Sequence, residues 1–348
     1  MHIGLFDYDL PAELIAQQPL PERDASRLLV LDRATGGLRH HGFRDLPDLL
    51  DPGDLLVVNR SRVFPARLLG RRAGGGAAEV LLVRAHHDDG ELWDALVRPG
   101  RRLRPGDVVE VAEDLSIRIE ARQGPGDESG PMRTVRLLLR SGDVAVTLER
   151  HGHVPLPPYI RRPDAAADRE RYQTVYAREA GSIAAPTAGL HFTPALLEAL
   201  RKRGIEQAEV VLHVGPGTFR PVEVENVTDH RVDPEAFVIP PETTEAVART
   251  RARGGRVVAV GTTATRALET AADSSASGPG AKETALVIVP GHRFRVVDGL
   301  VTNFHLPRSS LLLLVSAFAG RERVLAAYAE AVRERYRFYS YGDAMLIV

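Results

Sequence analysis

The sequence predicts an α/β fold, with a mostly parallel sheet flanked by helices and a small six-stranded β-barrel inserted into it. From residue 153 onward, apolar strand-like runs alternate with helix-like segments, and such repeats are typical of a parallel sheet covered on both faces. Between residues 70 and 152, short alternating segments instead follow one another with only turns between them. Strands of this kind leave exposed edges unless they close into a barrel.

Length and composition agree with two units. The chain has 348 residues and 44% hydrophobic content, enough to bury a sizeable core. We expect residues 1–69 and 153–348 to form one discontinuous α/β domain, and residues 70–152 to form the inserted barrel domain. In the first part, "LPAELIAQQPLPERDASRLLVLDR" predicts a short helix, a turn set by prolines and a strand over about Arg27–Leu31. A second strand is expected over residues 54–59.

The barrel segment contains six candidate strands. They are "AEVLLVRA", "LWDALVRP", "DVVEVAED", "LSIRIEAR", "RTVRLLLR" and "VAVTLER", separated by turns such as "RPGRRLRPGD". After this segment, helices are expected over residues 194–204, 240–255 and 263–272. They alternate with strands at "AEVVLHVG", "RVVAVGTT" and "TALVIVP".

Charge and cysteine content exclude several classes of protein. The chain has 45 basic and 46 acidic residues, so no global positive field indicates a nucleic-acid partner. Lys202 and Lys282 are the only lysines, which makes the abundance of arginine a compositional bias rather than a sign of phosphate recognition. The absence of cysteine excludes disulfides and thiolate metal sites, and the expected compartment is the cytoplasm. The longest apolar run, residues 311–320, is too short to span a bilayer, so no membrane association is expected.

Polar residues gather where the predicted strands end, which is where ligands bind in α/β proteins. Asn59, Ser61, Arg62 and Arg67 follow one strand, and His213 with a Gly-Pro-Gly-Thr turn follows another. Gly261, Thr262 and Thr263 follow a third, while Asn303 and His305 follow a fourth. The segment "GSIAAPTAGLHFT" (181–193) adds small residues around His191 and carries no charged acid, lysine or arginine.

These features also have structural explanations when taken singly. Gly and Thr in "GTTATR" commonly cap helices, "GPGTF" is a turn sequence, and an isolated histidine is usually a satisfied polar residue. Together, His191, His213 and His305, each beside small or hydroxyl residues, are expected to converge on one pocket. The chain has no G-x-G-x-x-G after its first strand, no Walker A lysine loop and no H-E-x-x-H, so no dinucleotide and no metal are expected. The residues alone therefore predict an α/β enzyme with a pocket lined by His and Thr.

A series of segments then identifies a family. The chain closely resembles the S-adenosylmethionine:tRNA ribosyltransferase-isomerase family of queuosine synthesis, in order from residue 5 to the C-terminus. The resemblance rests on "FDYDLPAELIAQQPL", "GHVPLPPYI", "ERYQTVYAREAGSIAAPTAGLHFT", "HVGPGTFRPV", "VGTTATRALE", "VDGLVTNFHLPRSSLLLLVSAFAG" and "YRFYSYGDAMLI". It implies a similar fold, an α/β domain that carries a six-stranded barrel.

The resemblance also implies a reaction. The ribosyl part of S-adenosylmethionine is transferred to 7-aminomethyl-7-deazaguanine at the tRNA wobble position and rearranged to an epoxycyclopentanediol. Epoxyqueuosine forms, and adenine and methionine are released. S-adenosylmethionine is then a co-substrate and ribosyl donor, tRNA is the partner, no metal is required, and a monomer is the default state.

On this basis we assign roles as hypotheses. His191, His213 and His305 are the candidate catalytic proton carriers, since histidine titrates near neutral pH. Arg266 is the candidate partner of the methionine carboxylate. Tyr172, Tyr176 and Phe192 are candidates to stack on a base, with core packing as an equal alternative. The remaining candidates for substrate binding are Asn59, Arg62, Arg67, Thr187, Gly189, Gly215, Gly217, Thr218, Thr262, Thr263 and Asn303.

Contacts to tRNA phosphates are expected from arginines, although for any one of them a solvated surface role is the better explanation. The candidates are Arg60, Arg62, Arg67, Arg98, Arg101, Arg102, Arg161 and Arg162. Two departures from the family pattern stand out: "NRSRV" replaces the usual N-D-T-R-V, and "TDHRVDPEAF" lacks a second histidine after His230. They leave open the alternative of a noncatalytic tRNA-binding homologue. The group of histidines leaves open another alternative, a metal-dependent hydrolase.

Overall fold

The computed structural model of the chain describes residues 1–86, 90–120, 132–219, 222–272 and 282–348. These residues form two compact units. The first comprises Met1–Arg62, Pro157–Arg162 and Arg171–Val348, and the second comprises Val63–Leu156 and Pro163–Glu170. Among the described residues, the helices are all too short or too polar to cross a membrane.

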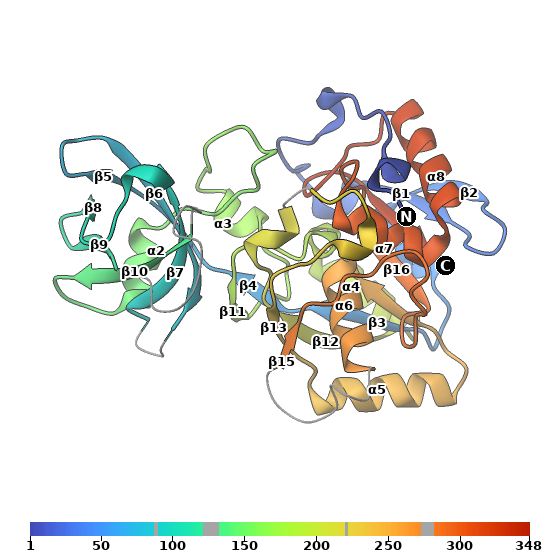
Figure 1. The fold of residues 1–348 in the computed structure, drawn as a ribbon. Coiled ribbons are helices and arrows are strands. Elements are labelled where there is room, and N and C mark those ends of the chain that lie inside the picture. Colours follow the sequence, from blue (N-terminus) through green and yellow to red (C-terminus); the bar gives the residue numbers. More distant parts are fainter. Residues whose placement is uncertain (87–89, 121–131, 220–221, 273–281) are drawn as a thin grey trace. The chain divides into compact units, whose positions relative to one another are not determined.

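The first unit is built on a nine-stranded sheet (Figure 1). Its strands, in spatial order, are β15 (Lys282–Thr284), β13 (Glu235–Val238), β12 (Glu206–Leu212), β3 (Leu55–Asn59), β14 (Val257–Val260), β16 (Gly299–Asn303), β17 (Ala344–Ile347), β1 (Arg27–Leu31) and β2 (Leu38–Gly42). The predicted α/β class is confirmed, but the sheet is mixed rather than mostly parallel. The central strands β12, β3, β14 and β16 run parallel to one another, and so do β17 and β1.

A short hairpin turn explains the antiparallel pair β1 and β2 at one edge of the sheet. β1 and β2 form a hairpin, and the Asp32 carboxylate closes its turn by accepting the N–H groups of Ala34 and Thr35 at 2.9 and 2.8 Å. Such a turn leaves no room for a crossover helix, which parallel neighbours require. β16 and β17 are also antiparallel, whereas β17 and β1 are parallel.

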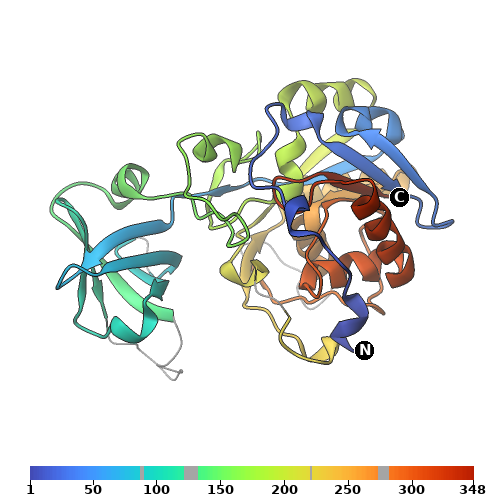
Figure 2. The ribbon, with the colours of Figure 1, turned by 90° about the horizontal axis from the view of Figure 1, so that it is seen from above.

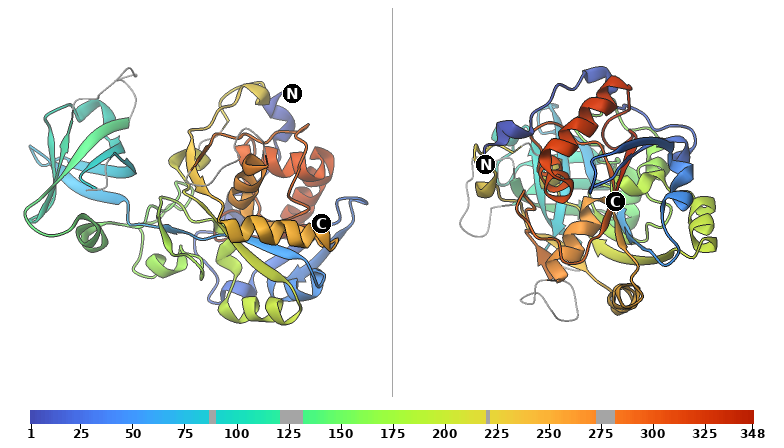
Figure 3. Two further views of the ribbon diagram at one scale, coloured as in Figure 1. Left: turned by 90° about the horizontal axis from the view of Figure 1, so that it is seen from below. Right: turned by 90° about the vertical axis from the view of Figure 1, so that its right-hand side faces the viewer.

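Helices cover both faces of this sheet. Along β3, Leu55 and Val57 face a core that includes α5 (Pro241–Ala252), α6 (Gly261–Ala271), α7 (Ser310–Ala319) and α8 (Arg321–Arg333). Leu56 and Val58 face the other core, with α1 (Leu46–Leu49) and α4 (Pro194–Lys202). Figures 2 and 3 show α4 on one side of the sheet and α7 and α8 on the other. Alternate side chains of one strand therefore build both cores.

The expected helices over 194–204, 240–255 and 263–272 are present as α4, α5 and α6. The predicted N-terminal helix is only a 3-10 turn, Ala12–Leu14, because the next residues pair elsewhere: Phe338 N–H donates to Leu14 O at 2.7 Å. The strand expected at "TALVIVP" ends at Thr284. Beyond it, Leu286 O accepts a hydrogen bond from Arg266 Nε rather than from a neighbouring strand.

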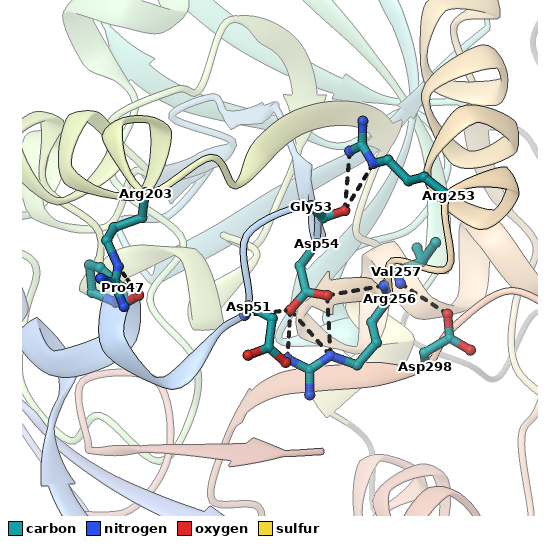
Figure 4. A network of polar contacts seen from close by, with 9 residues as sticks. All are labelled: Pro47, Asp51, Gly53, Asp54, Arg203, Arg253, Arg256, Val257 and Asp298. Atoms are coloured by element: carbon teal, nitrogen blue, oxygen red, sulfur yellow. Dashed lines mark hydrogen bonds and ion pairs between the residues drawn. The ribbon is translucent and has the colours of Figure 1, made fainter.

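The amino ends of β3 and β14 are held by a buried carboxylate (Figure 4). Asp54 is 2% exposed, and its Oδ1 accepts the Arg256 N–H at 3.0 Å. Its Oδ2 accepts the Asp51 N–H at 2.9 Å and Arg256 Nη2 at 2.6 Å. These bonds fix the two strands side by side, so their carboxyl ends, at the opposite edge, are also in register.

The second unit is a closed six-stranded barrel, in the order β10-β7-β6-β5-β8-β9. The strands are β5 (Arg67–Arg72), β6 (Ala77–Ala85), β7 (Leu92–Arg98), β8 (Val108–Ala112), β9 (Leu115–Ile119) and β10 (Met132–Leu139). Gly70 permits closure, because a Cβ there would lie 2.5 Å from Glu110 O on β8.

One predicted barrel strand is wrong. The segment "VAVTLER" forms α2 (Val144–His151), and the sixth strand is instead β5, which begins before the expected boundary at residue 70 and crosses it. Asp143 explains the difference, since its carboxylate caps the helix by accepting the N–H groups of Ala145 and Val146.

Candidate active site

A pocket of about 510 Å³, open to solvent, lies at the carboxyl edge of the central strands. The described residues that line it are Tyr159, Ala184, Ala185, Pro186, Thr187, Ala188, Val214, Gly261, Thr262, Thr263, Thr302, Asn303, Phe304, His305, Leu311, Tyr339 and Ser340. We call it the strand-edge pocket.

Two segments of small residues give the strand-edge pocket its walls. One runs from the end of β11 (Glu179–Ser182) through Ala184, Ala185 and Pro186 to the 3-10 turn Thr187–His191. The other is the start of α6, where Gly261 has φ +88°, a conformation that favours glycine. The Thr263 hydroxyl has no hydrogen-bond partner among the described residues. It is therefore available to a ligand.

Asn303 joins the pocket to a buried hydrogen-bonded chain. Its Nδ2 donates to Tyr339 O and His191 Nε2, both at 3.1 Å, which fixes the orientation of the amide. His191 Nδ1 then carries the proton and donates to Ser26 Oγ at 2.7 Å. Because the amide nitrogen is used in this way, Asn303 Oδ1 is left without a partner in the described part of the chain.

His191 is an uncharged histidine. Burial, together with the nearby charges of Arg337 and Arg23, lowers its pKa to about 3. Its ring stacks on Phe43 with 4.9 Å between the ring centres. Both nitrogens are bonded to protein groups, so in this arrangement the ring positions Asn303 rather than facing the strand-edge pocket.

His305 is also uncharged, because burial lowers its pKa to about 3. Its own N–H donates to the Tyr328 hydroxyl oxygen at 3.1 Å, which leaves the Tyr328 hydroxyl proton to bond His305 Nδ1 at 3.2 Å. The ring proton is therefore on Nε2, 3.4 Å from Thr302 Oγ1. The Tyr8 hydroxyl donates to the main-chain oxygen of His305. His305 thus presents a fixed N–H donor in the pocket lining.

His213 does not join the other two histidines. Its ring lies against Gly181, where a Cβ would come within 2.7 Å of the imidazole, and it is not part of the pocket lining. Burial lowers its pKa, and Nδ1 has no partner among the described residues. Of the three predicted histidines, His305 is the one in the strand-edge lining, so the structure does not bring all three together there. Val214, the next residue, does line the pocket.

A second pocket, of about 280 Å³, adjoins the first. It shares Ser340 with the strand-edge pocket, and its lining includes His191, which is bonded to Asn303. The other described residues that line it are Pro19, Leu20, Glu22, Arg23, Ser26, Arg171, Leu190, Tyr341 and Gly342. We call it the arginine pocket.

Several predicted binding residues have structural roles instead. Asn59 is fully buried and bonds Leu212 O, Leu212 N and Ser61 N, which ties the ends of β3 and β12 together. Arg266 pairs with Glu235, which occupies the guanidinium expected to meet a carboxylate.

The predicted stacking residues belong to the core. Tyr172 and Phe192 are fully buried, and Tyr176 is 9% exposed. Gly189 packs on Tyr176, where a Cβ would lie 2.1 Å from the hydroxyl oxygen. The alternative explanation, core packing, holds for these side chains.

The loop after β12 and the remaining arginines also lie outside the strand-edge lining. The Gly215 N–H bonds Glu235, Gly217 lies near Asp233, and the side chain of Thr218 is outside the described part of the structure. Arg67 belongs to the barrel, where it pairs with Glu79 at 2.9 Å, and Arg62 is exposed in β4 (Ser61–Val63). Arg60 pairs with Glu209.

Some lining residues were not predicted. Tyr159, Thr302, Tyr339 and Ser340 come from segments that the sequence marked only through the family resemblance. Ser26 and Tyr328, which fix the protons of the two buried histidines, carry no signal in the sequence. Among the described residues there is no group of three or more His, Cys, Asp or Glu side chains that could hold a metal ion.

Comparison with known proteins gives one consistent result. A model of the queuosine biosynthesis protein family matches residues 3–347. S-adenosylmethionine:tRNA ribosyltransferase-isomerases of Pelobacter propionicus and Moorella thermoacetica are each 54% identical, with 100% of both chains covered. The crystal structure of S-adenosylmethionine tRNA ribosyltransferase from Thermotoga maritima, at 2.00 Å resolution, has a TM-score of 0.55 and 41% identity. That comparison covers 99% of this chain and 100% of the other.

Proposed function

Because the chain belongs to the queuosine biosynthesis protein family, we propose that it is an S-adenosylmethionine:tRNA ribosyltransferase-isomerase that works in the strand-edge pocket. In this proposal the acceptor is 7-aminomethyl-7-deazaguanine at the tRNA wobble position. The ribosyl part of S-adenosylmethionine is transferred and rearranged, which gives epoxyqueuosine and releases adenine and methionine. The observation that carries the proposal is the family match over the whole chain together with a pocket built from the matched segments.

The charge of the strand-edge pocket suits a sulfonium ligand. S-adenosylmethionine carries a positive sulfur, and a protonated histidine beside it would repel that charge. Burial keeps His305 uncharged at neutral pH, and the same holds for His191 behind Asn303. The lining thus offers hydroxyls, an amide and neutral imidazole without adding positive charge.

The polar groups of the lining suit the rest of the molecule. The start of α6, with the N–H groups near Gly261 and the hydroxyls of Thr262 and Thr263, favours the methionine carboxylate. Asn303 Oδ1, an acceptor without a partner among the described residues, suits an amino or hydroxyl donor. The small residues Ala184–Ala188 allow a flat adenine to approach the main chain.

The proposed roles of the histidines differ from one another. A histidine with a pKa near 3 is a poor proton acceptor at neutral pH, so we assign His305 the role of a fixed Nε2–H donor to the substrate. His191 is a positioning residue that acts through Asn303. His213 lies outside the strand-edge lining, with its ring against Gly181, so we assign it no proton transfer in that pocket.

The direct test mixes purified protein, S-adenosylmethionine and tRNA that carries 7-aminomethyl-7-deazaguanine. We expect one adenine released for each wobble nucleoside that gains the epoxyqueuosine mass. Release of methylthioadenosine or homocysteine-containing products instead would contradict the proposal.

The alternative of a noncatalytic homologue gains no support from the departing positions. Arg60 pairs with Glu209, and Ser61 is buried next to Asn59. Neither residue lines the strand-edge pocket. In the reaction mixture, tRNA binding without any adenine release would favour this alternative.

A further inference from the structure

Arg23 and Arg171 line the arginine pocket, and Arg337 lies beside it, since a Cβ on the lining residue Gly342 would come 2.5 Å from Arg337 O. Arg171 donates to Leu20 O at 2.7 Å and to Pro21 O at 2.5 Å. Arg337 donates to Gln18 O, and Arg23 donates to Leu190 O at 3.2 Å. For Arg171 and Arg337, the carbonyl oxygens hold the side chain in place without neutralising its charge.

Among the residues that the structure describes, neither Arg171 nor Arg337 forms an ion pair. Other arginines of the same unit do pair with carboxylates, for example Arg44 with Asp24 and Arg333 with Glu330. Arginine has five N–H donors, of which Arg171 uses two and Arg337 uses one in these bonds. Both retain donors and a full charge for a further partner.

The charges act on one place. Arg337 and Arg23 both lower the pKa of His191, which means that their guanidinium groups lie close to the same imidazole. The acidic groups nearby are Glu22, which is in the lining, and Asp343. Asp343 is buried and accepts the main-chain N–H groups of Arg27 and Arg337, and burial raises its pKa. The arginines therefore outnumber the carboxylates around the arginine pocket.

We propose that the arginine pocket binds the phosphodiester backbone of the substrate RNA next to the nucleotide that enters the strand-edge pocket. The inference rests on the proposed function, which supplies an RNA substrate. Planar guanidinium groups fixed at their tips match phosphate oxygens, and a single-stranded loop presents such phosphates with its bases turned outward. The shared Ser340 and the bond between His191 and Asn303 show that the two pockets are neighbours.

This assignment differs from the arginines expected from the sequence. Arg67 is paired within the barrel, and Arg60 is paired with Glu209. The structure points instead to Arg23 and Arg171 in the lining and to Arg337 beside it, which are separated by more than 100 residues in sequence and come near one another only in the fold. A purely structural role, clamping residues 17–21, is the competing explanation that the experiment must separate.

The test measures binding of an unmodified tRNA transcript as a function of salt, so it does not require turnover. We expect Arg171→Gln together with Arg337→Gln to weaken binding and to lower the slope of log K against log salt by about 0.7 for each lost contact to a single strand. The KM for S-adenosylmethionine stays unchanged. Arg201→Gln, an exposed arginine on α4, is the matched control and leaves the slope as in the unmodified protein.

Arg171→Lys separates charge from the clamp, because lysine keeps the charge but cannot bond both Leu20 O and Pro21 O with a planar fork. We expect Arg171→Lys to retain most of the salt slope. If Arg171→Lys lowers the salt slope as much as Arg171→Gln does, the proposal is overturned. It is also overturned if the double Gln variant binds tRNA with an unchanged slope.

The two proposals fail in different ways. A lowered slope in the double variant, with no adenine released by the unmodified protein, supports docking and contradicts the proposed reaction. Adenine release with the same KM for tRNA and the same slope in both proteins supports the reaction and contradicts docking.

Discussion

Asn303 shows how much of the pocket depends on single polar atoms. Its Nδ2 serves Tyr339 O and His191 Nε2, and its Oδ1 is left for a ligand. Asn303→Asp keeps the shape but turns a carboxylate oxygen toward the carbonyl of Tyr339. We expect a loss of about 1–3 kcal/mol in the free energy of unfolding and loss of adenine release.

Urea unfolding checks the stability of this variant. Tyr172→Phe is a suitable control, since the Tyr172 hydroxyl is buried without a hydrogen-bond partner among the described residues. Tyr172→Phe should lower the free energy of unfolding only slightly. If Asn303→Asp is as stable as this control, the assigned orientation of the Asn303 amide is wrong.

The buried histidines predict a pH dependence of stability. His191 and His305 have a pKa of about 3 in the folded protein, against about 6.5 when unfolded. The unfolded state therefore binds more protons between these values, so stability is complete above pH 6.5 and falls as the pH drops toward 3. Each histidine lowers the free energy of unfolding by at most about 1.4 kcal/mol per pH unit in that window.

Unfolding midpoints at pH 7 and pH 5 measure this loss. The two histidine rings have different hydrogen-bond partners, Tyr328 for His305 and Ser26 for His191. His305→Gln should therefore remove the pH dependence of stability that comes from His305 and leave the part that comes from His191. An identical slope in the variant and the unmodified protein would mean that His305 is protonated in the fold.

The residues that follow the strands could be predicted from the sequence, but their hydrogen-bond partners could not. Thr262, Thr263, Asn303 and His305 follow apolar runs, and the location of ligand sites at strand ends placed them correctly in the lining. Ser26 lies 165 residues from His191 in sequence, and no local pattern indicates that contact. His213 also follows a strand, but its ring turns toward Gly181.

At the scale of elements, the start of α6 is the most sensitive point. Gly261 has φ +88°, and a Cβ there would lie 3.5 Å from the Ala188 Cβ, so alanine is strained by its backbone rather than by a clash. We expect Gly261→Ala to cost about 1–2 kcal/mol of stability and to raise the KM for S-adenosylmethionine.

Gly254 provides the matched control, since it has φ +78° and nothing within 4 Å of an added Cβ. Gly254→Ala should lose similar stability with an unchanged KM. If both variants change KM equally, or neither does, the start of α6 does not bind the substrate.

Prediction of elements failed where a cap or a distant partner decided the outcome. "VAVTLER" alternates like a strand, but the Asp143 cap starts a helix, and β5 then closes the barrel in its place. The strands β14 and β16 were predictable, because helical segments, α6 and α7, follow them in the sequence. The antiparallel edges depend on hairpins and on pairing between distant segments, which a single sequence does not reveal.

At the scale of the whole α/β unit, the edge of the sheet at the amino ends of the central strands stabilises the fold, and the opposite edge forms the strand-edge pocket. Asp54 fixes the amino ends of β3 and β14, at the edge opposite the strand-edge pocket. We expect Asp54→Ala to cost about 2–4 kcal/mol, because it leaves several donors unsatisfied, while kcat per folded molecule is unchanged.

Asp51 is the control at this edge. It contacts the same Arg256 at 2.9 Å but is 79% exposed, so Asp51→Ala should cost under about 1 kcal/mol. Equal losses from the two substitutions, measured by urea unfolding, would mean that burial of Asp54 does not stabilise the sheet.

The central claim is that the strand-edge pocket holds S-adenosylmethionine. A crystal structure of the protein with this ligand tests it most directly. The account predicts the methionine carboxylate at the start of α6, beside Thr262 and Thr263, and the sulfonium among the uncharged groups near Asn303 and His305. Density for the ligand in the arginine pocket, or away from the carboxyl edge of the central strands, would contradict it.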